Sequence, residues 1–202
     1  MQQTACAAAK QALRRVMRQR AAARCAADTA ASSRQICAAV IASAQFQAAQ
    51  TVFVYVSVRN EPDTAEILRS AWDVGKAVFV PRCGKAPMMQ AVRIHSPQDL
   101  QPGAFGIPEP VARCTETAEG TQLALAIVPC LAASHDGGRL GHGAGYYDAF
   151  LRNSSAIRLC LCPAALLCDA IPMDAHDVRM EYVATERGLF ACVPTGQRTK
   201  LV

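Results

Sequence analysis

The sequence predicts an α/β protein with a three-layer, open, mostly parallel sheet and helices on both of its faces. Two observations lead to this fold class. Apolar runs of strand length recur along the chain, and segments with the apolar spacing of a helix separate them. Alternation of this kind is typical of a parallel sheet that helices cover from both sides. Since the 202 residues contain no internal repeat and no linker-like segment, residues 1–202 are expected to form a single domain.

The individual elements follow from periodicity and from punctuation by glycine and proline. Strand-length apolar runs predict strands over residues 51–58, 76–82, 88–94, 123–129, 156–162 and 181–185. Helical spacing predicts helices over residues 32–46, from 63 or 64 to 74, and over 145–152. In the second of these helices, Glu66 is placed to form a capping box with Asp63, and Gly75 marks the end. Residues 96–120 are interrupted by prolines and glycines and are expected to form a loop.

The first 27 residues contain six basic side chains and no acidic one. Two interpretations stay open, because a mitochondrial transit peptide has this composition and a functional first helix has it too. In a helix, Lys10, Arg14 and Arg18 form one line, since they are four residues apart. An apolar stripe beside that line consists of Leu13, Val16 and Met17. Such a helix rests on the protein and holds cations at the edge of the contact, although a merely solvated basic face has the same pattern.

Composition and charge exclude several classes of function. The chain is 51% apolar and 18% charged, and no apolar run reaches the roughly 20 residues of a membrane helix, so no membrane association is expected. The net charge of +5 is too small to indicate nucleic-acid binding, and it suits small polyanions. The ten cysteines are scattered without a CxxC pair, which favours reduced thiols and a cytoplasmic location. Cys160 and Cys162 are expected on the inner face of a strand.

Residues 139–148, RLGHGAGYYD, point to phosphate chemistry. They follow a predicted strand and enter a predicted helix, where ligands of open α/β sheets bind. Three glycines let backbone N–H groups approach an anion; they are Gly141, Gly143 and Gly145. Arg139 adds a cation, and Asp148 is placed to hold Mg²⁺. The block matches neither a Walker loop nor GxGxxG, so a glycine-rich turn without a ligand, followed by a carboxylate that the helix dipole favours, stays an alternative.

The chain resembles the 5-formyltetrahydrofolate cyclo-ligases, also called 5,10-methenyltetrahydrofolate synthetases, over nearly its whole length. The similar segments are KQALRRVMRQR, VYVSVRNEPDTAEIL, VFVPR, FGIPEP, IVPCLAASHDGGRLGHGAGYYDAFL and DAHDVRMEYVATE. The RLGxGxGYYD pattern is specific, and the other segments follow in the family's order. The predicted sheet is Rossmann-like and related to the sugar-phosphate isomerase and CoA transferase architecture. The resemblance implies ATP- and Mg²⁺-dependent closure of 5-formyltetrahydrofolate (folinic acid) to 5,10-methenyltetrahydrofolate, with release of ADP and phosphate.

In the implied reaction, the formyl oxygen attacks the γ-phosphate, N10 of the folate closes on the activated carbon, and phosphate leaves. The protein then positions its substrates and neutralises charge, without a protein nucleophile. By resemblance, the ATP-binding residues are Lys10, Arg14, Arg139, Leu140, Gly141, His142, Gly143, Ala144, Gly145, Tyr146 and Tyr147. The implied folate contacts are Val56, Glu61 and Tyr147, and the implied Mg²⁺ ligands are Asp148 and Glu181. Arg139 and Tyr147 are the implied catalytic residues.

Three positions depart from the family pattern. Glu181 stands where the family usually has aspartate, and LAASHD replaces LAFD, with Ala133 or Ser134 in place of a large apolar residue. His142 occupies a variable position and is expected to be an exposed side chain and not a catalyst. Two other classes stay open: a non-catalytic folate-binding protein, and an enzyme like the sugar-phosphate isomerases or CoA transferases. We expect a monomer that acts on a small-molecule folate, with or without a polyglutamate chain.

Overall fold

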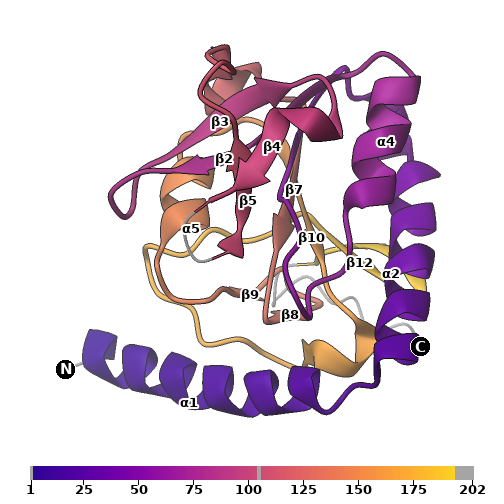
Figure 1. Ribbon diagram of the computed structural model, residues 1–202. Helices are drawn as coiled ribbons and strands as arrows, with labels where there is room; N and C mark the ends of the chain where they lie inside the picture. Colours follow the sequence, from indigo (N-terminus) through magenta and orange to yellow (C-terminus); the bar gives the residue numbers. More distant parts are fainter. Residues whose placement is uncertain (1, 104–105, 194–202) are drawn as a thin grey trace.

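A mixed sheet of eight strands forms the centre of the structure, a computed structural model that describes residues 2–103 and 106–193 (Figure 1). Its strand order is β13-β12-β10-β7-β1-β2-β3-β6. In that order, the strand bounds are Gly188–Ala191, Tyr182–Thr185, Ile157–Leu161, Leu125–Pro129, Thr51–Val54, Ala77–Cys83, Met89–Ile94 and Thr117–Ala118. The helices are α1 (Gln2–Ala22), α2 (Ala26–Ile41), α3 (Ala44–Ala48), α4 (Ala65–Asp73) and α5 (Tyr146–Leu151).

The middle of the sheet is parallel, as predicted, and its edges are antiparallel. Strands β12, β10, β7, β1 and β2 pair in parallel. In contrast, β13, β3 and β6 each run antiparallel to their neighbour. All five residues of β7 are buried. A strand that is buried on both faces reads as a continuous apolar run, which is why the sequence predicted the central strands.

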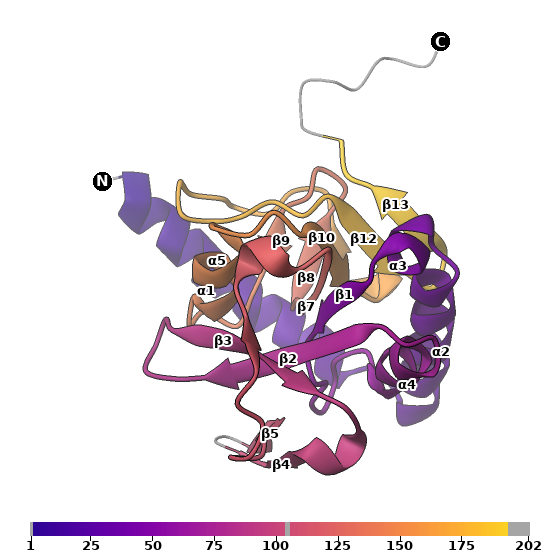
Figure 2. The same cartoon turned by 90° about the horizontal axis from the view of Figure 1, so that it is seen from above.

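Helices lie on both faces of the sheet. On one face, Ile36 of α2 and Ile67 of α4 pack against Val52 of β1. On the other face, Leu151 of α5 belongs to a second apolar cluster, together with Phe53, which follows Val52 in β1. Successive residues of β1 therefore point to opposite layers, as the period of a strand requires. Figures 1 and 2 show α2 and α4 together on one side, α5 on the other, and α1 across the lower edge of the sheet in Figure 1.

Several short strands were not predicted. The segment 96–120, which was expected to be a loop, contains β6 and a separate two-stranded sheet. The further short strands are β4 (Leu100–Pro102), β5 (Pro108–Pro110), β8 (Ala132–Ser134), β9 (Arg139–Leu140) and β11 (Leu167–Cys168). Strands β8 and β9 pair antiparallel, and β11 pairs with β8. Elements of two or three residues are too short for a recognisable alternation of apolar and polar positions.

Helix α1 packs on the protein through a narrower stripe than predicted. Met17 is 2% exposed and Leu13 is partly buried against the same cluster. Val16, which was assigned to the stripe, is instead 38% exposed. The reason is geometric: adjacent helical residues lie about 100° apart around the axis, and the buried face is carried by Leu13, Met17 and Ala21.

The chain leaves β1 earlier than predicted and enters α4 without the predicted capping box. The strand ends at Val54, because the carbonyl of Tyr55 accepts a hydrogen bond from the buried hydroxyl of Thr64 at 2.8 Å. Helix α4 begins after Thr64, and the described residues show no side-chain cap there. Asp63 instead accepts a hydrogen bond from the Ala65 N–H at 3.0 Å. The predicted capping box of Asp63 with Glu66 is therefore not formed.

All ten cysteines lie in the described residues and are free thiols. Cys160 and Cys162 are fully buried in one apolar cluster, as predicted for the inner face of a strand. Across residues 2–103 and 106–193, no helix combines the length and the apolar character that a membrane span requires.

Candidate active site

The glycine-rich block, residues 139–148, lies at the carboxyl ends of the central parallel strands. Strand β7 ends at Pro129, the β8–β9 hairpin follows, and the block continues from β9 into α5. The loop after β1 meets the block, because Oε1 of Glu61 lies 3.1 Å from Nε2 of His142. Ligands of open α/β sheets bind at this edge. The structure therefore brings the predicted phosphate block and the predicted folate loop together.

Backbone geometry favours glycine at two positions of the block, and a neighbouring side chain leaves little room at the third. Gly143 and Gly145 have φ angles of +113° and +77°, which residues other than glycine rarely adopt. A Cβ atom at Gly141 would lie 3.1 Å from Nη1 of Arg139. Leu140, which precedes them, is 1% exposed and anchors the block in the core. Residues 142–145 are exposed, so bare backbone faces solvent above a buried cation.

Two arginines of α1 contact the glycine-rich block. Nε of Arg14 donates to the carbonyl of Gly141 at 2.9 Å, and Nη2 of Arg18 donates to the carbonyl of His142 at 3.3 Å. A Cβ at Gly143 would lie 3.5 Å from Cζ of Arg14, an ordinary van der Waals contact, so it is the φ angle and not the space that favours glycine there. Two cations of the basic line predicted on α1 therefore contact the block, and of these Arg18 stays exposed to solvent.

Lys10, the third cation of that line, contacts two carboxylates in this structure, and its contact with ATP stays a prediction. It is 8% exposed, and its Nζ donates to Asp174 at 2.7 Å and to Asp177. Burial lowers the pKa of Lys10, but the hydrogen bonds and charges of the two carboxylates outweigh burial and raise its pKa above the ordinary value. The hydrogen bond from Lys10 holds the pKa of Asp174 below its ordinary value. We call the contact of Lys10 with Asp174 and Asp177 the clasp. The sequence did not predict it, although both aspartates lie in the DAHD segment.

Arg139 and Asp148 form an ion pair beneath the block. Nη2 of Arg139 lies 2.9 Å from Oδ2 of Asp148, and the two side chains are 2% and 24% exposed. Nη1 of Arg139 donates to the carbonyl of Pro129 at 3.3 Å, and Oδ1 of Asp148 accepts from the Val178 N–H at 3.1 Å. Nε of Arg139 is buried and has no hydrogen-bond partner among the described residues. The predicted phosphate cation and the predicted metal ligand are therefore direct neighbours.

Glu181, the second predicted metal ligand, lies in a different setting. It directly precedes β12, and its carboxylate accepts hydrogen bonds from the backbone and side chain of Arg158 at 3.0 and 3.1 Å. These contacts are near the amino ends of β10 and β12, whereas the block follows the carboxyl end of β7. The described part of the chain contains no group of three or more histidine, cysteine or acidic side chains placed to hold a metal ion. The role of Glu181 in metal binding stays a prediction.

The predicted folate residues surround the start of α5. Oε2 of Glu61 accepts a hydrogen bond from the Val58 N–H at 3.0 Å, which fixes the carboxylate. Val56 is partly buried in one apolar cluster, and the ring of Tyr147 packs against both clusters with its centroid 5.8 Å from Cζ of Arg139. Burial, and next the charge of Glu61, raise the pKa of Tyr147. The phenol of Tyr147 is therefore neutral at physiological pH.

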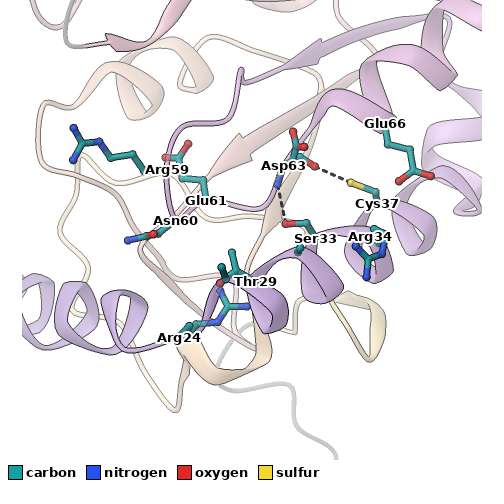
Figure 3. A pocket seen from close by; sticks show the side chains of 12 residues that line it. Arg24, Thr29, Ser33, Arg34, Cys37, Arg59, Asn60, Glu61, Asp63 and Glu66 are labelled. Atoms are coloured by element: carbon teal, nitrogen blue, oxygen red, sulfur yellow. Dashed lines mark hydrogen bonds between the residues drawn. The ribbon is translucent and has the colours of Figure 1, made fainter.

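Two recesses border this edge of the sheet. The first has a volume of about 460 Å³, and Figure 3 shows α2 along one side and the loop with Arg59, Asn60 and Glu61 along the other. The second has a volume of about 520 Å³ and lies between the β2–β3 turn and α5. Its lining residues are Arg82, Cys83, Gly84, Pro87, Met88, Met89, Gln90, Ala149 and Phe150. Tyr146 borders it, since its hydroxyl donates to the Gly84 carbonyl at 3.1 Å.

Comparisons with known proteins identify the family of this chain. A model of the 5-formyltetrahydrofolate cyclo-ligase family matches residues 6–186. The 5-formyltetrahydrofolate cyclo-ligase of Mus musculus is 29% identical and covers 88% of this chain and 94% of its own length. The enzyme of that name from Mycolicibacterium smegmatis is 31% identical over 70% of this chain and 77% of its own.

Solved structures show the same fold. The Aquifex aeolicus 5,10-methenyltetrahydrofolate synthetase superposes with a TM-score of 0.80 at 24% identity, over 95% of this chain and 97% of that one. The synthetase from Mycoplasma pneumoniae superposes with a TM-score of 0.71 at 17% identity, over 88% of this chain and 98% of that one. Both share the α/β architecture with its large sheet. The chain therefore belongs to the 5-formyltetrahydrofolate cyclo-ligase family.

Proposed function

We propose that this chain closes 5-formyltetrahydrofolate to 5,10-methenyltetrahydrofolate and uses ATP and Mg²⁺ to do so. One observation carries the proposal beyond family membership. Arg14 of α1, Glu61 of the loop after β1 and the block from Arg139 to Asp148 are far apart in sequence and meet at one edge of the sheet. All three lie in segments in which the chain resembles the family, and the pattern of the block is the specific one.

The block fits a triphosphate. Its exposed glycine backbone offers N–H groups without side chains in the way, and Arg14, Arg18 and Arg139 surround it with positive charge. The buried, unpartnered Nε of Arg139 is a donor that an added anion or water would satisfy. We place the phosphates of ATP here and assign their orientation to these side chains.

The charge and position of Asp148 fit a divalent cation beside the phosphates. One oxygen faces Arg139 and the other accepts a backbone N–H, but an ionised carboxylate has about four lone-pair sites and can add a further partner. Mg²⁺ usually takes one or two carboxylates and completes its shell with phosphate and water. When bound, it neutralises charge on the transferred phosphoryl group. Glu181 pairs with Arg158 near the amino ends of β10 and β12, so its part in this site stays a prediction.

The folate ring system is assigned to the loop after β1. A glutamate carboxylate accepts two parallel N–H bonds, which matches the amide and amino groups of a pterin, and Val56 and Tyr147 supply apolar surface beside Glu61. The recess beside Tyr146 has thioether and aromatic walls that suit the substrate's aryl group. Because burial raises the pKa of Tyr147, its phenol donates a hydrogen bond and does not accept a proton. The chain thus contributes positioning and charge, and no nucleophile.

The assay that tests the proposal follows the absorbance of the methenyl product. We expect purified protein to produce it from 5-formyltetrahydrofolate only when both ATP and Mg²⁺ are present. A protein that binds the folate without ATP-dependent product would be a non-catalytic folate binder, and a protein that binds no folate would refute the proposal. Repeating the assay with polyglutamylated substrate measures whether this chain prefers it.

A further inference from the structure

We propose that His142 is a latch on Glu61: the imidazole competes with the folate for the same carboxylate, and this competition sets folate affinity and its pH dependence. The inference rests on the proposed function, because it takes Glu61 as the folate-binding carboxylate. It concerns a residue that lies between two glycines of the block and joins it to the loop after β1.

The carboxylate of Glu61 is engaged on both oxygens. Oε1 faces Nε2 of His142 at 3.1 Å, and Oε2 accepts the Val58 N–H at 3.0 Å. The Glu61 side chain is 12% exposed, whereas that of His142 is 52% exposed. The imidazole therefore covers the carboxylate from the solvent side and can swing away without disturbing the core.

A pterin needs the oxygen that His142 occupies. Two parallel N–H bonds from the ligand use both oxygens of one carboxylate. Oε2 can keep its bond to Val58 and accept a second one, since each carboxylate oxygen has two lone pairs. Oε1 already faces the imidazole at 3.1 Å, and the Glu61 side chain is only 12% exposed, so little open surface is left beside the ring for a ligand. A folate that binds Glu61 therefore competes with His142 for this surface.

Contacts from neighbouring elements fix the backbone around the imidazole. Arg14 and Arg18 of α1 bind the carbonyls of Gly141 and His142. Arg139 of β9 lies beneath Gly141. These three cations contact the backbone beside His142, and the acidic group in contact with its ring is Glu61. Helix α1 thus sets the position of the latch.

Protonation strengthens the latch. Histidine is the side chain whose charge ordinarily changes between about pH 5 and pH 8. A protonated imidazole makes a charge-assisted hydrogen bond to the carboxylate, roughly twice as strong as a neutral one. Lowering the pH in this range therefore favours the closed pair and weakens folate binding.

The test measures the dissociation constant of 5-formyltetrahydrofolate by calorimetry without ATP, at pH 8 and pH 6. Wild-type protein should bind more weakly at pH 6. His142→Ala should bind about three- to tenfold more tightly than wild type at pH 6, as expected for loss of one competing hydrogen bond, and should show little pH dependence. His142→Gln keeps a donor but does not titrate, so its affinity should be equal at both pH values. His95→Ala, which alters an exposed histidine outside the site, should retain the wild-type profile.

Weaker or unchanged folate binding in His142→Ala would overturn the proposal, because the imidazole would then assist the ligand or play no part.

An NMR experiment separates this failure from failure of the proposed function. Without folate, Glu61→Gln should move the imidazole resonances of His142, and added folate should move them in the same direction in wild type. If Glu61→Gln leaves them in place, the latch does not exist. If wild-type protein binds no folate, the proposed function fails as well.

Discussion

Replacement of Lys10 by methionine tests how α1 is held against the site. Methionine keeps a long apolar stem but removes the charge and the three N–H donors of the ammonium group. In the structure, that group is buried and donates to Asp174 at 2.7 Å and to Asp177. The substitution therefore leaves two partly buried carboxylates close together without their cation.

The expected loss follows from these contacts. A hydrogen bond to a charged group contributes about 1.5–3 kcal/mol, and mutual repulsion of the carboxylates adds to the loss. We expect Lys10→Met to lower the free energy of unfolding by about 2–3 kcal/mol. For a chain of this size, that corresponds to a fall in Tm of roughly 5–10 °C.

Urea unfolding followed by circular dichroism measures this change. Arg15→Met is the matched control, since Arg15 is an exposed cation on the same helix and its loss should cost less than about 0.5 kcal/mol. A double-mutant cycle of Lys10→Met with Asp174→Asn should show favourable coupling. A Lys10→Met protein as stable as the Arg15→Met control, with no coupling to Asp174, would refute the clasp.

The pH dependence of the clasp has a defined sign. The raised pKa of Lys10 means that its contribution is present below the ordinary lysine pKa and is lost as the pH rises through the folded value. The lowered pKa of Asp174 means that its contribution is present above about pH 4 and is lost as the pH falls through the folded value. Acid unfolding of the Lys10→Met protein should therefore show a smaller loss of stability below pH 4 than that of wild type.

Three further predictions concern the block and α1. Arg139→Lys should lower kcat/KM at least about tenfold, roughly 1.4 kcal/mol, because lysine cannot reach Asp148, the Pro129 carbonyl and a phosphate together; wild-type kinetics would contradict the assignment. A protein that begins at Asp28 should lose ATP binding in calorimetry and much of its stability, since it lacks Met17 and the contacts of Arg14; full activity would support the transit-peptide interpretation. Gly143→Ala should destabilise the fold by about 1–3 kcal/mol and raise the KM for ATP, because alanine is strained at φ +113°; an unchanged KM would separate this glycine from the nucleotide.

The sequence predicted the parts of the fold that carry long patterns. Strand β7 is buried on both faces and reads as one apolar run. Helix α4 kept its apolar stripe and its glycine stop at Gly75, which has a φ angle of +73°. Its predicted capping box from Asp63 did not form, because the helix begins after Thr64, one residue later than that box requires, and the Thr64 hydroxyl binds the Tyr55 carbonyl. The contact between Thr64 and Tyr55 depends on how the loop between them folds back, and the local sequence carries no signal for that.

The site was predicted unevenly for a similar reason. Glycine at 143 and 145 follows from backbone geometry, which a sequence pattern can reveal, whereas glycine at 141 gives room to the Arg139 side chain. Two contacts between distant segments carry no local signal: Lys10 with Asp174, and Glu61 with His142. Each joins residues more than 80 positions apart, as the separations of 164 and 81 show. The exposure of His142 was predicted correctly, but its partner was not.

The three cations of the line on α1 illustrate why spacing alone does not assign a role. Lys10, Arg14 and Arg18 are equivalent in the sequence pattern, yet they lie against different partners. The first meets two carboxylates and holds the helix in place, and the other two meet backbone carbonyls of the block and add positive charge beside it. Since the anchoring ion pair fixes the helix without using the arginines, their charge stays available to an anion that binds at the glycines. A helix attached only through those arginines would lose its hold whenever an anion competed for them, whereas this arrangement separates attachment from binding.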